Sequence, residues 1–334
     1  MKILYGIQGT GNGHISKAET IYPILKKYAD VDILISASNY SLKPSFPVKY
    51  KKKGISFSVT RGQINYWLTL KNLDLKTFLI DINSISFDKY DLVVSDFEPI
   101  TSWGAKKYGI KSLQISHQAA FNSMKSPRPF IINPFAELII KYFAPTNEYI
   151  GLHFKKYSDN ISNPIIKKSI LNLKTTDESH ITIYLPFEDD ETLIDIFSKI
   201  QNHTFHVFKP NIVKEYSNKN IIFKSISTQK FDKSLASCHG VICNAGFETP
   251  SEALFLGKRL IVVPVKKQYE QECNAVALKK IGITVIKKLN RKSLDLINEW
   301  LMMKPIKMTF KSNFEDYLVR KISKIVNKVN CKLH

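Results

Sequence analysis

The sequence predicts an α/β protein built from two Rossmann-like, doubly wound domains that face each other across a cleft. The chain has 334 residues, about twice the length of an average domain. Short apolar runs rich in β-branched residues alternate with longer helical segments, and this alternation starts again in the second half. A polar segment at 155–168, which contains Pro164, separates the two halves.

The first half contains four apolar runs that we predict to be parallel strands. Because these runs are continuously apolar, both faces of their sheet should be buried. A helical segment at 15–28 follows the first run directly. The predicted strands are 2–7, 31–37, 91–96 and 111–116.

The second half repeats the pattern and then ends in a basic, amphipathic segment. We expect an N-terminal domain at 1–160, a C-terminal domain at 161–311, and a terminal helix within 312–334. This last helix should pack back toward the N-terminal domain. The predicted strands of the second half are 180–185, 205–208, 220–223, 240–245 and 259–265.

The composition narrows the choice of partners and of compartment. Lysine and arginine outnumber the acids 49 to 29, a net charge of +20, which suits a phosphorylated substrate, an anionic membrane or simply a lysine-rich surface. The four cysteines form no CxxC pair, so we expect a reduced, cytoplasmic chain without structural zinc. The apolar stretch 130–144 is too interrupted to span a bilayer, and it either packs in the core or lies on a membrane.

A glycine-rich loop, GTGNGH at 9–14, lies between the first strand and the first helix. Gly11 and Gly13 let the backbone turn tightly and leave helix N–H groups for an anion or a sugar oxygen. The loop is not a P-loop, because no GK[ST] follows. It is not a good dinucleotide fingerprint either, because the second strand ends in Ser36-Ala37-Ser38 and not in an acid. The alternative is a tight turn that only packs helix on strand.

Three side chains near this loop are candidates for general-base chemistry. His14 begins the helix, where the helix dipole disfavours imidazolium and so favours a neutral base. Asp96 and Glu98 follow a buried strand at the edge of the sheet where functional crevices lie. Asp96 either orients His14 or, like Glu98, is itself the base. The alternatives are that His14 caps its turn, that Asp96 caps the next helix, and that Glu98 lies in that helix's first turn.

The segment 243–275 combines several features of a nucleotide-sugar site. A strand leads into Asn244 and Gly246, and a helix that contains Glu252 follows. A glycine-bearing loop at a helix N-terminus can hold phosphate, and a carboxylate one turn later can accept two hydroxyls of a ribose. The alternative is a capping box, since Thr249 and Glu252 have its spacing and Pro250 stands between them.

An acid–amide pair, Glu270 and Gln271, follows the next strand and could hold a hexose. The whole segment 243–275 resembles the donor-binding motif of GT-B-fold glycosyltransferases. The likeness is strongest to the family that includes the N-acetylglucosaminyltransferase of peptidoglycan lipid II synthesis. The GTGNGH loop, Gly246, Glu252, Glu270 and Gln271 carry this resemblance. Ser116-His117-Gln118 and Asn163-Pro164 also resemble segments of that family in part.

The resemblance implies an inverting transfer from a nucleoside diphosphate sugar, most often a UDP-sugar, without metal or cofactor. It implies an N-terminal acceptor-binding domain at 1–160 and a C-terminal nucleotide-sugar-binding domain at 161–311, with a cleft between them. It also implies that Glu252 binds ribose and that Gly246 and its helix bind the diphosphate. Glu270 and Gln271 would then bind the sugar, and Ile226 would lie against the base.

The sequence leaves the acceptor open between a lipid-linked intermediate, a surface polysaccharide or other glycan, a small molecule and DNA. A lipid-linked acceptor would give the apolar stretch a purpose, because the chain would then work at the inner face of the cell membrane.

The chain departs from the family at two places. Leu185-Pro186-Phe187-Glu188 replaces a glycine-rich loop, and Asp96-Phe97-Glu98-Pro99 replaces another, where it supplies carboxylates. Two rival functions remain open. A UDP-sugar epimerase on the same fold would use a similar donor site, and the charge of +20 also suits a non-catalytic nucleic-acid-binding protein, although no nucleic-acid-binding motif is present. A nicotinamide dehydrogenase is disfavoured by the missing ribose acid.

Overall fold

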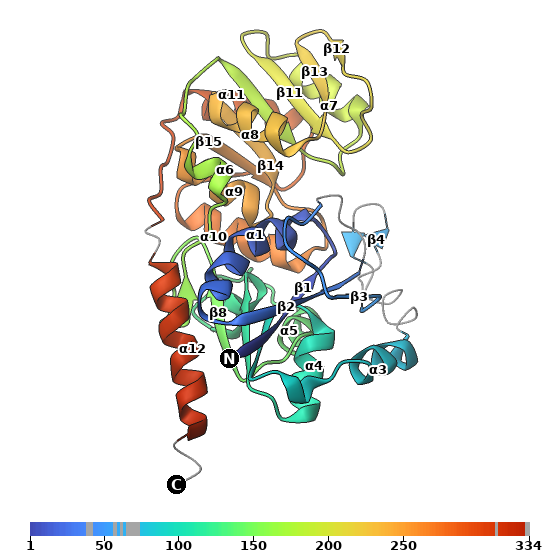
Figure 1. Cartoon of the computed structure of the whole chain (residues 1–334). Helices are drawn as coiled ribbons and strands as arrows, with labels where there is room; N and C mark the ends of the chain where they lie inside the picture. Colours follow the sequence, from blue (N-terminus) through green and yellow to red (C-terminus); the bar gives the residue numbers. More distant parts are fainter. Residues whose placement is uncertain (38–42, 56–58, 61–62, 65–73, 311–312, 331–334) are drawn as a thin grey trace.

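The protein folds into two α/β domains, one above the other in Figure 1. The computed structural model describes residues 1–37, 43–55, 59–60, 63–64, 74–310 and 313–330. Each domain carries a seven-stranded sheet with helices on both faces. The predicted fold class is therefore confirmed.

The N-terminal sheet has the strand order β3-β2-β1-β6-β7-β8-β9, and all its pairs are parallel. The predicted runs form β1, β2, β6 and β7, whose residues are largely buried because helices cover both faces. The strands are β1 (Lys2–Gln8), β2 (Asp30–Ser36), β3 (Tyr50–Lys52), β6 (Leu92–Asp96), β7 (Ser112–Ser116), β8 (Glu148–Leu152) and β9 (Ile161–Ser162). A separate antiparallel pair joins β4 (Val59–Thr60) and β5 (Gln63–Ile64).

The C-terminal sheet has the order β12-β13-β11-β10-β14-β15-β16, in which β12 alone of the described strands is antiparallel to its neighbour. All five predicted runs of this half are strands. The bounds are β10 (His180–Tyr184), β11 (Thr204–Lys209), β12 (Tyr216–Asn218), β13 (Ile221–Ser225), β14 (Gly240–Asn244), β15 (Arg259–Val263) and β16 (Thr284–Val285). In both domains the first strand lies near the middle, the order of a doubly wound sheet.

The helices cover each sheet from both sides. In the N-terminal domain, α1 and α12 pack on one face, and α3 and α4 pack on the other. The N-terminal and linker helices are α1 (Asn12–Tyr28), α3 (Leu75–Asn83), α4 (Pro99–Tyr108), α5 (Pro134–Tyr142) and α6 (Lys168–Leu171). The remaining helices are α7 (Asp190–Phe197), α8 (Thr228–Ser237), α9 (Glu248–Leu256), α10 (Tyr269–Lys280), α11 (Leu294–Met302) and α12 (Phe314–Asn330). Short 3-10 turns occupy η1 (Phe87–Lys89), η2 (Gln118–Asn122) and η3 (Arg291–Ser293).

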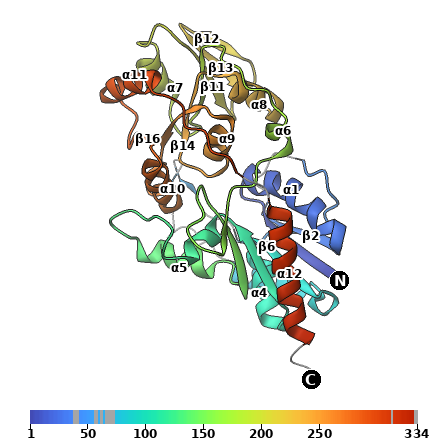
Figure 2. The ribbon, with the colours of Figure 1, turned by 90° about the vertical axis from the view of Figure 1, so that its left-hand side faces the viewer.

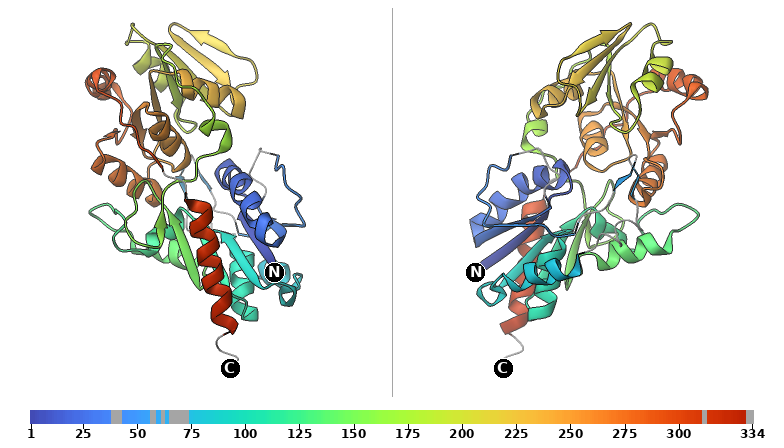
Figure 3. Two further views of the ribbon diagram at one scale, coloured as in Figure 1. Left: turned by 60° about the vertical axis from the view of Figure 1, so that its left-hand side comes forward. Right: turned by 90° about the vertical axis from the view of Figure 1, so that its right-hand side faces the viewer.

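The C-terminal helix α12 lies along the N-terminal domain, although the chain reaches it from the C-terminal domain (Figure 2). Two further views show the same placement (Figure 3). Leu318 and Ile322 belong to the same buried apolar group as residues of α1. Glu315 accepts a hydrogen bond from Lys27 Nζ at 2.8 Å, and Lys321 Nζ contacts Glu148 at 2.7 Å. The chain therefore crosses between the domains twice, which ties their positions together.

Most of the apolar segment 130–144 lies outside the core, although Ala136 and Ala144 are buried. Helix α5 lies within it, and of the nine residues of α5 only Ala136 is buried. Phe130 is fully exposed, and Phe135, Leu138 and Tyr142 are each about half exposed. The packing alternative for this segment is therefore wrong. No helix in the described part of the chain is long and apolar enough to cross a bilayer.

Candidate active site

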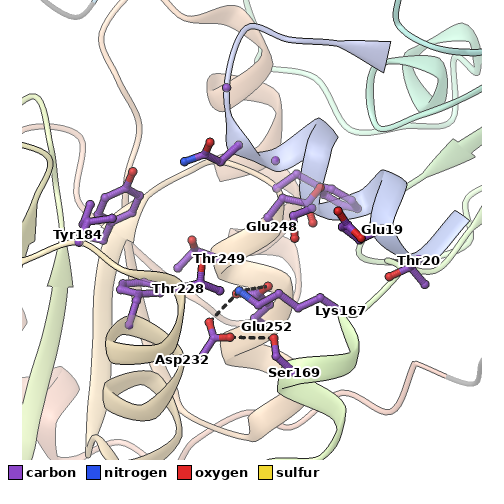
Figure 4. A pocket seen from close by; sticks show the side chains of 18 of the residues that line it. Glu19, Thr20, Lys167, Ser169, Tyr184, Thr228, Asp232, Glu248, Thr249 and Glu252 are labelled. Atoms are coloured by element: carbon purple, nitrogen blue, oxygen red, sulfur yellow. Dashed lines mark hydrogen bonds and ion pairs between the residues drawn. The ribbon is translucent and has the colours of Figure 1, made fainter. Parts of the chain in front are cut away.

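A cavity of about 1030 Å³ lies between the two domains at the carboxyl ends of their strands. Loops that follow β1, β10, β13 and β14 all border it, as expected for the crevice of a doubly wound sheet. Figure 4 shows side chains from both domains and from the linker pointing into it. Of the predicted donor residues, those lining the cavity are Gly11, Gly13, Ile226, Asn244, Gly246, Thr249, Glu252 and Gln271. His14, Asp96, Glu98 and Glu270 are not among its lining residues in the described part of the chain.

The glycine-rich loop brings the N-terminal domain into contact with helix α9. Helix α1 begins at Asn12, and Gly11 precedes it in an extended conformation. A Cβ on Gly13 would stand 3.3 Å from Glu248 Cγ, at the start of α9. An alanine at position 13 would therefore require the Glu248 side chain to shift by a few tenths of an ångström.

His14 and Asp96 form a hydrogen-bonded pair beside this loop. His14 Nδ1 lies 2.9 Å from Asp96 Oδ1, and Lys17 Nζ lies 2.8 Å from the same oxygen. Asp96 is completely buried, and burial alone would raise its pKa, but the electrostatic interactions and hydrogen bonds with His14 and Lys17 outweigh that effect and hold the pKa below its ordinary value. An ionised Asp96 accepts the Nδ1 proton, which leaves Nε2 of His14 free to take a proton.

Glu98 has a different place from the one expected for a base. Its carboxylate accepts hydrogen bonds from the N–H groups of Ile100 and Thr101, at 2.8 and 2.6 Å, and so caps α4. Phe97 between the two acids has a left-handed φ of 54°, and Glu98 follows it into the helix cap. The structure thus corrects two expectations, because Glu98 and not Asp96 is the cap, and Glu98 is buried away from the cavity.

The loop after β14 presents an open helix N-terminus to the cavity. Within the described chain, α9 has no side-chain cap, and no atom lies within 4 Å of the position where a Cβ of Gly246 would stand. The capping box that Thr249 and Glu252 could have formed is therefore not present. Asn244 braces the loop, since its Nδ2 donates to the carbonyl of Val263 at 2.9 Å. Such a helix end can bind an anion.

Glu252 pairs with a lysine of the linker. Lys167 Nζ lies 3.1 Å from Glu252 Oε1 and 2.7 Å from Asp232 Oδ1 (Figure 4). Burial raises the pKa of Glu252 to about 7, against the opposing effect of Lys167. Glu248 also lines the cavity, and burial raises its pKa to about 7.

The two residues of the acid–amide pair on α10, Glu270 and Gln271, lie in different environments. Gln271 lines the cavity, and its Oε1 accepts from the N–H of Val265 at 3.0 Å. Glu270 instead contacts the N-terminal domain, where Gln118 Nε2 donates to its Oε2 at 3.0 Å. Glu270 is therefore part of a contact between the domains in this conformation.

His117 is buried at the same contact. Its Nδ1 lies 2.7 Å from the carbonyl oxygen of Leu152, and its Nε2 lies 2.7 Å from Oδ1 of Asn274 on α10. The ring stacks on Phe247 with centroids 4.1 Å apart. Burial lowers the pKa of His117, despite the opposing charge of Glu270. Its place between the domains suggests a structural role.

Sequence reasoning missed five charged residues that line the cavity, and three of them are the interacting groups described above, Lys167, Asp232 and Glu248. Lys167 follows an apolar pair in the linker, and Asp232 lies inside an ordinary helical pattern, so neither has a local signal. Glu248 precedes the proposed capping positions and was the easiest of the three to find. No three His, Cys, Asp or Glu side chains in the described ranges converge on a point that could hold a metal ion.

Comparison with known proteins identifies the family. Residues 1–305 match the family model described as glycosyl transferase family 1. The chain belongs to glycosyl transferase family 1. It is therefore a glycosyltransferase with the GT-B architecture that its two facing domains display. No curated protein is detectably similar to it in sequence.

Solved glycosyltransferase structures share this fold at low sequence identity. An Arabidopsis thaliana UGT protein crystallised with UDP superposes with a TM-score of 0.61, at 12% identity over 90% of each chain. A UDP-glucosyltransferase from Polygonum tinctorium gives 0.59, at 14% identity over 98% of this chain and 93% of that one. MurG from Acinetobacter baumannii gives 0.52, at 13% identity over 90% of each chain. These similarities establish the fold.

Proposed function

We propose that this glycosyltransferase moves a sugar from a UDP-sugar to an acceptor hydroxyl. The observation that carries the proposal is the uncapped α9 N-terminus, which faces a cavity large enough for a nucleotide sugar, with Glu252 one turn further along. An Arabidopsis thaliana protein of the same fold was crystallised with UDP, which supports a uridine nucleotide.

The donor would lie with its parts against different elements of the cavity. Ile226 would contact the base, and Glu252 the ribose. Gly246 and the first turn of α9 would hold the diphosphate, with Gly11 and Gly13 facing it from the other domain. Gln271 would contact the sugar, and Glu270 would join it if Gln118 releases the carboxylate.

The proposed chemistry is a single inverting displacement that needs no metal ion or cofactor. The acceptor oxygen bonds to the anomeric carbon while the bond from that carbon to the diphosphate breaks. His14 Nε2 takes the proton of the acceptor hydroxyl, and Asp96 holds the other ring nitrogen. The dipole of α9 stabilises the negative charge on the departing diphosphate.

We propose that the enzyme meets its acceptor at a membrane surface. The exposed apolar side chains of 130–142 lie next to exposed Lys125 and Lys141, which suits the anionic face of a bilayer. Glu137 of α5 accepts a hydrogen bond from Tyr269 at 2.6 Å, so this surface adjoins the residue before Glu270. We propose a glycan or lipid-linked acceptor, presented at the inner face of the cell membrane.

Calorimetric titration of UDP tests the donor site. Wild-type protein should bind UDP, and Glu252→Ala should bind it at least tenfold more weakly, since a hydrogen bond to a charged group contributes about 1.5–3 kcal/mol. Lys174→Met is a suitable control, because Lys174 is exposed and lies outside the described lining of the cavity. Equal affinities in wild type and Glu252→Ala would refute the ribose role.

Turnover assays separate transfer from the rival functions. Wild-type protein should release UDP from a UDP-sugar only when an acceptor is present. Interconversion of UDP-sugars without an acceptor would instead establish an epimerase. Binding of nucleic acid, with no affinity for UDP, would establish the nucleic-acid-binding alternative.

A further inference from the structure

Three charged side chains of the cavity form one connected cluster, Lys167, Asp232 and Glu252 (Figure 4). They come from the linker, α8 and α9 respectively. Lys167 is 19% exposed, Asp232 6% and Glu252 7%, so water screens the cluster little. Ser169 Oγ donates to Asp232 Oδ2 at 2.7 Å and fixes the second carboxylate from the linker side.

A buried ion pair of this kind is a poor source of stability. The desolvation of the charges offsets most of their attraction, and apolar replacements are often as stable. All three side chains line the cavity, where a ligand can use their charge. Lys167 Nζ holds Oε1 of Glu252, which leaves Oε2, with its two lone pairs, as the oxygen that can accept the hydroxyls of a ribose.

We propose that Lys167 is a positioning residue for the nucleotide's ribose, which keeps the Glu252 carboxylate charged and aimed into the cavity while Asp232 anchors the lysine. This inference rests on the proposed binding of a UDP-sugar. It adds to that proposal a selection for ribonucleotides over deoxyribonucleotides, because a correctly aimed carboxylate accepts both hydroxyls of a ribose and only one of a 2′-deoxyribose.

The electrostatics of the site predict how pH affects binding. The groups that face Glu252 are Lys167 from the linker, Asp232 from α8, Glu248 from its own helix and the thiol of Cys243 from β14. Burial raises the pKa of Glu252 to about 7, and Lys167 opposes that rise. The carboxylate is thus lost as pH falls below about 7, and without Lys167 it would be lost at a higher pH.

The experiment is calorimetric titration of UDP and of 2′-deoxy-UDP between pH 6 and 8.5. It compares wild type, Lys167→Met, Lys167→Arg and the control Lys174→Met. Each protein is also measured with Glu248→Gln added, because Glu248 titrates in the same range. Circular dichroism checks that each variant is folded.

Wild type and Lys174→Met should prefer UDP over 2′-deoxy-UDP, and their affinity for UDP should fall below about pH 7. Lys167→Met should bind UDP about tenfold more weakly at pH 7. It should also lose the preference for ribose and show its fall in affinity at a higher pH. Lys167→Arg should restore both properties, because the guanidinium keeps the charge.

An unchanged ribose preference and pH profile in folded Lys167→Met would overturn the inference, even if its melting temperature changed. If that variant does not fold, Asp232→Asn replaces it. This substitution removes the anchor of Lys167, and it should reduce the ribose preference. An unchanged preference there would equally refute the role. Failure of wild type to bind UDP at all would instead refute the proposed function.

Discussion

At the scale of single residues, the partner of His14 depends on how the chain turns after β6. Asp96 ends the strand and meets His14 and Lys17, whereas Glu98, two residues later, caps α4. Phe97 separates them with a left-handed backbone, a conformation that disfavours a bulky residue and that its packing on Phe143 must offset. The two acids therefore have unrelated environments although they are near neighbours in sequence.

His14→Ala should reduce turnover about 10²–10⁴-fold, because it removes the proposed base. The affinity for UDP should change little, since His14 is not among the described residues that line the cavity. Steady-state kinetics and calorimetric titration of the same preparation measure the two effects.

Glu98→Gln serves as the matched comparison for His14→Ala. Its single amide oxygen can accept from only one of the two N–H groups that the carboxylate caps, so the variant should be less stable, but the folded protein should retain turnover. Loss of turnover in Glu98→Gln together with normal turnover in His14→Ala would assign the base to Glu98 and contradict the pairing argued here.

At the scale of secondary structure, two glycines at opposite ends of α9 have different functions. Gly246 precedes the helix, has no positive φ and has open space around it. Gly257 ends the helix with a φ of 68°, a conformation that strongly favours glycine. Gly246 leaves open space at the start of α9, which we assign to a ligand, and Gly257 allows the backbone turn that ends the helix.

Gly246→Ala should weaken UDP binding without lowering the melting temperature, because the new methyl group enters space that we assign to the diphosphate. Gly257→Ala should do the opposite and lower the free energy of unfolding by roughly 1–2 kcal/mol. Thermal melts and UDP titrations of both variants check that Gly246→Ala affects binding and Gly257→Ala affects stability. A Gly246→Ala protein that binds UDP normally would argue against a diphosphate at α9.

The exposed segment around α5 is the second element with a testable role. The protein should float with anionic vesicles at low salt and be released at high salt, because apolar insertion and lysine attraction act together. The double variant Phe130→Ser/Phe135→Ser should bind vesicles much less. Val213→Ser is the control, since Val213 is equally apolar and 94% exposed in the other domain.

Vesicle flotation at low and high salt measures this membrane association directly. Wild-type protein that stays with the soluble fraction on anionic vesicles at low salt would contradict the membrane proposal. A soluble acceptor would then be the better hypothesis, and the donor site would be unaffected.

At the scale of the whole molecule, buried histidines lie close to the contact between the domains. His117 bridges to α10, and His153 lies beside it with ring centroids 5.1 Å apart. Burial lowers the pKa of both, and that of His153 falls well below its ordinary value. The folded protein therefore holds these rings neutral, whereas the unfolded chain protonates them below about pH 6.5.

Because the unfolded state binds more protons there, these histidines make stability fall as pH drops below about 6.5. Each contributes a slope of up to about 1.4 kcal/mol per pH unit. Buried Glu98, Glu248 and Glu252 act in the opposite direction, since their pKa values are raised. A comparison of the pH dependence of stability between His153→Phe and wild type isolates the contribution of His153.

Denaturant unfolding between pH 5 and 8 should show a less steep acid loss of stability in His153→Phe than in wild type. Phenylalanine suits the site, because His153 already packs against Phe121, Phe154 and Tyr157. Identical slopes in the two proteins would mean that His153 is not held neutral in the folded state.

Most of the architecture was predictable because it depends on local patterns. Continuous apolar runs marked nine of the strands, and the glycines marked the loops between them. The missed strands are short, as in β9 and β16, or mixed in polarity, as in β8. Two-residue strands have no periodicity of their own, so only their pairing with a neighbouring strand defines them.

The sequence by itself determined the two parallel sheets, the glycine loop and the donor segment, because hydrophobic periodicity and turn chemistry operate over a few residues. Only the tertiary structure decided which charged groups meet. Asp96 pairs with His14, Lys167 with Glu252, and Glu270 with Gln118, all between distant parts of the chain. It also decided that α5 is exposed, because an amphipathic helix has the same sequence pattern whether its apolar face packs on protein or remains uncovered.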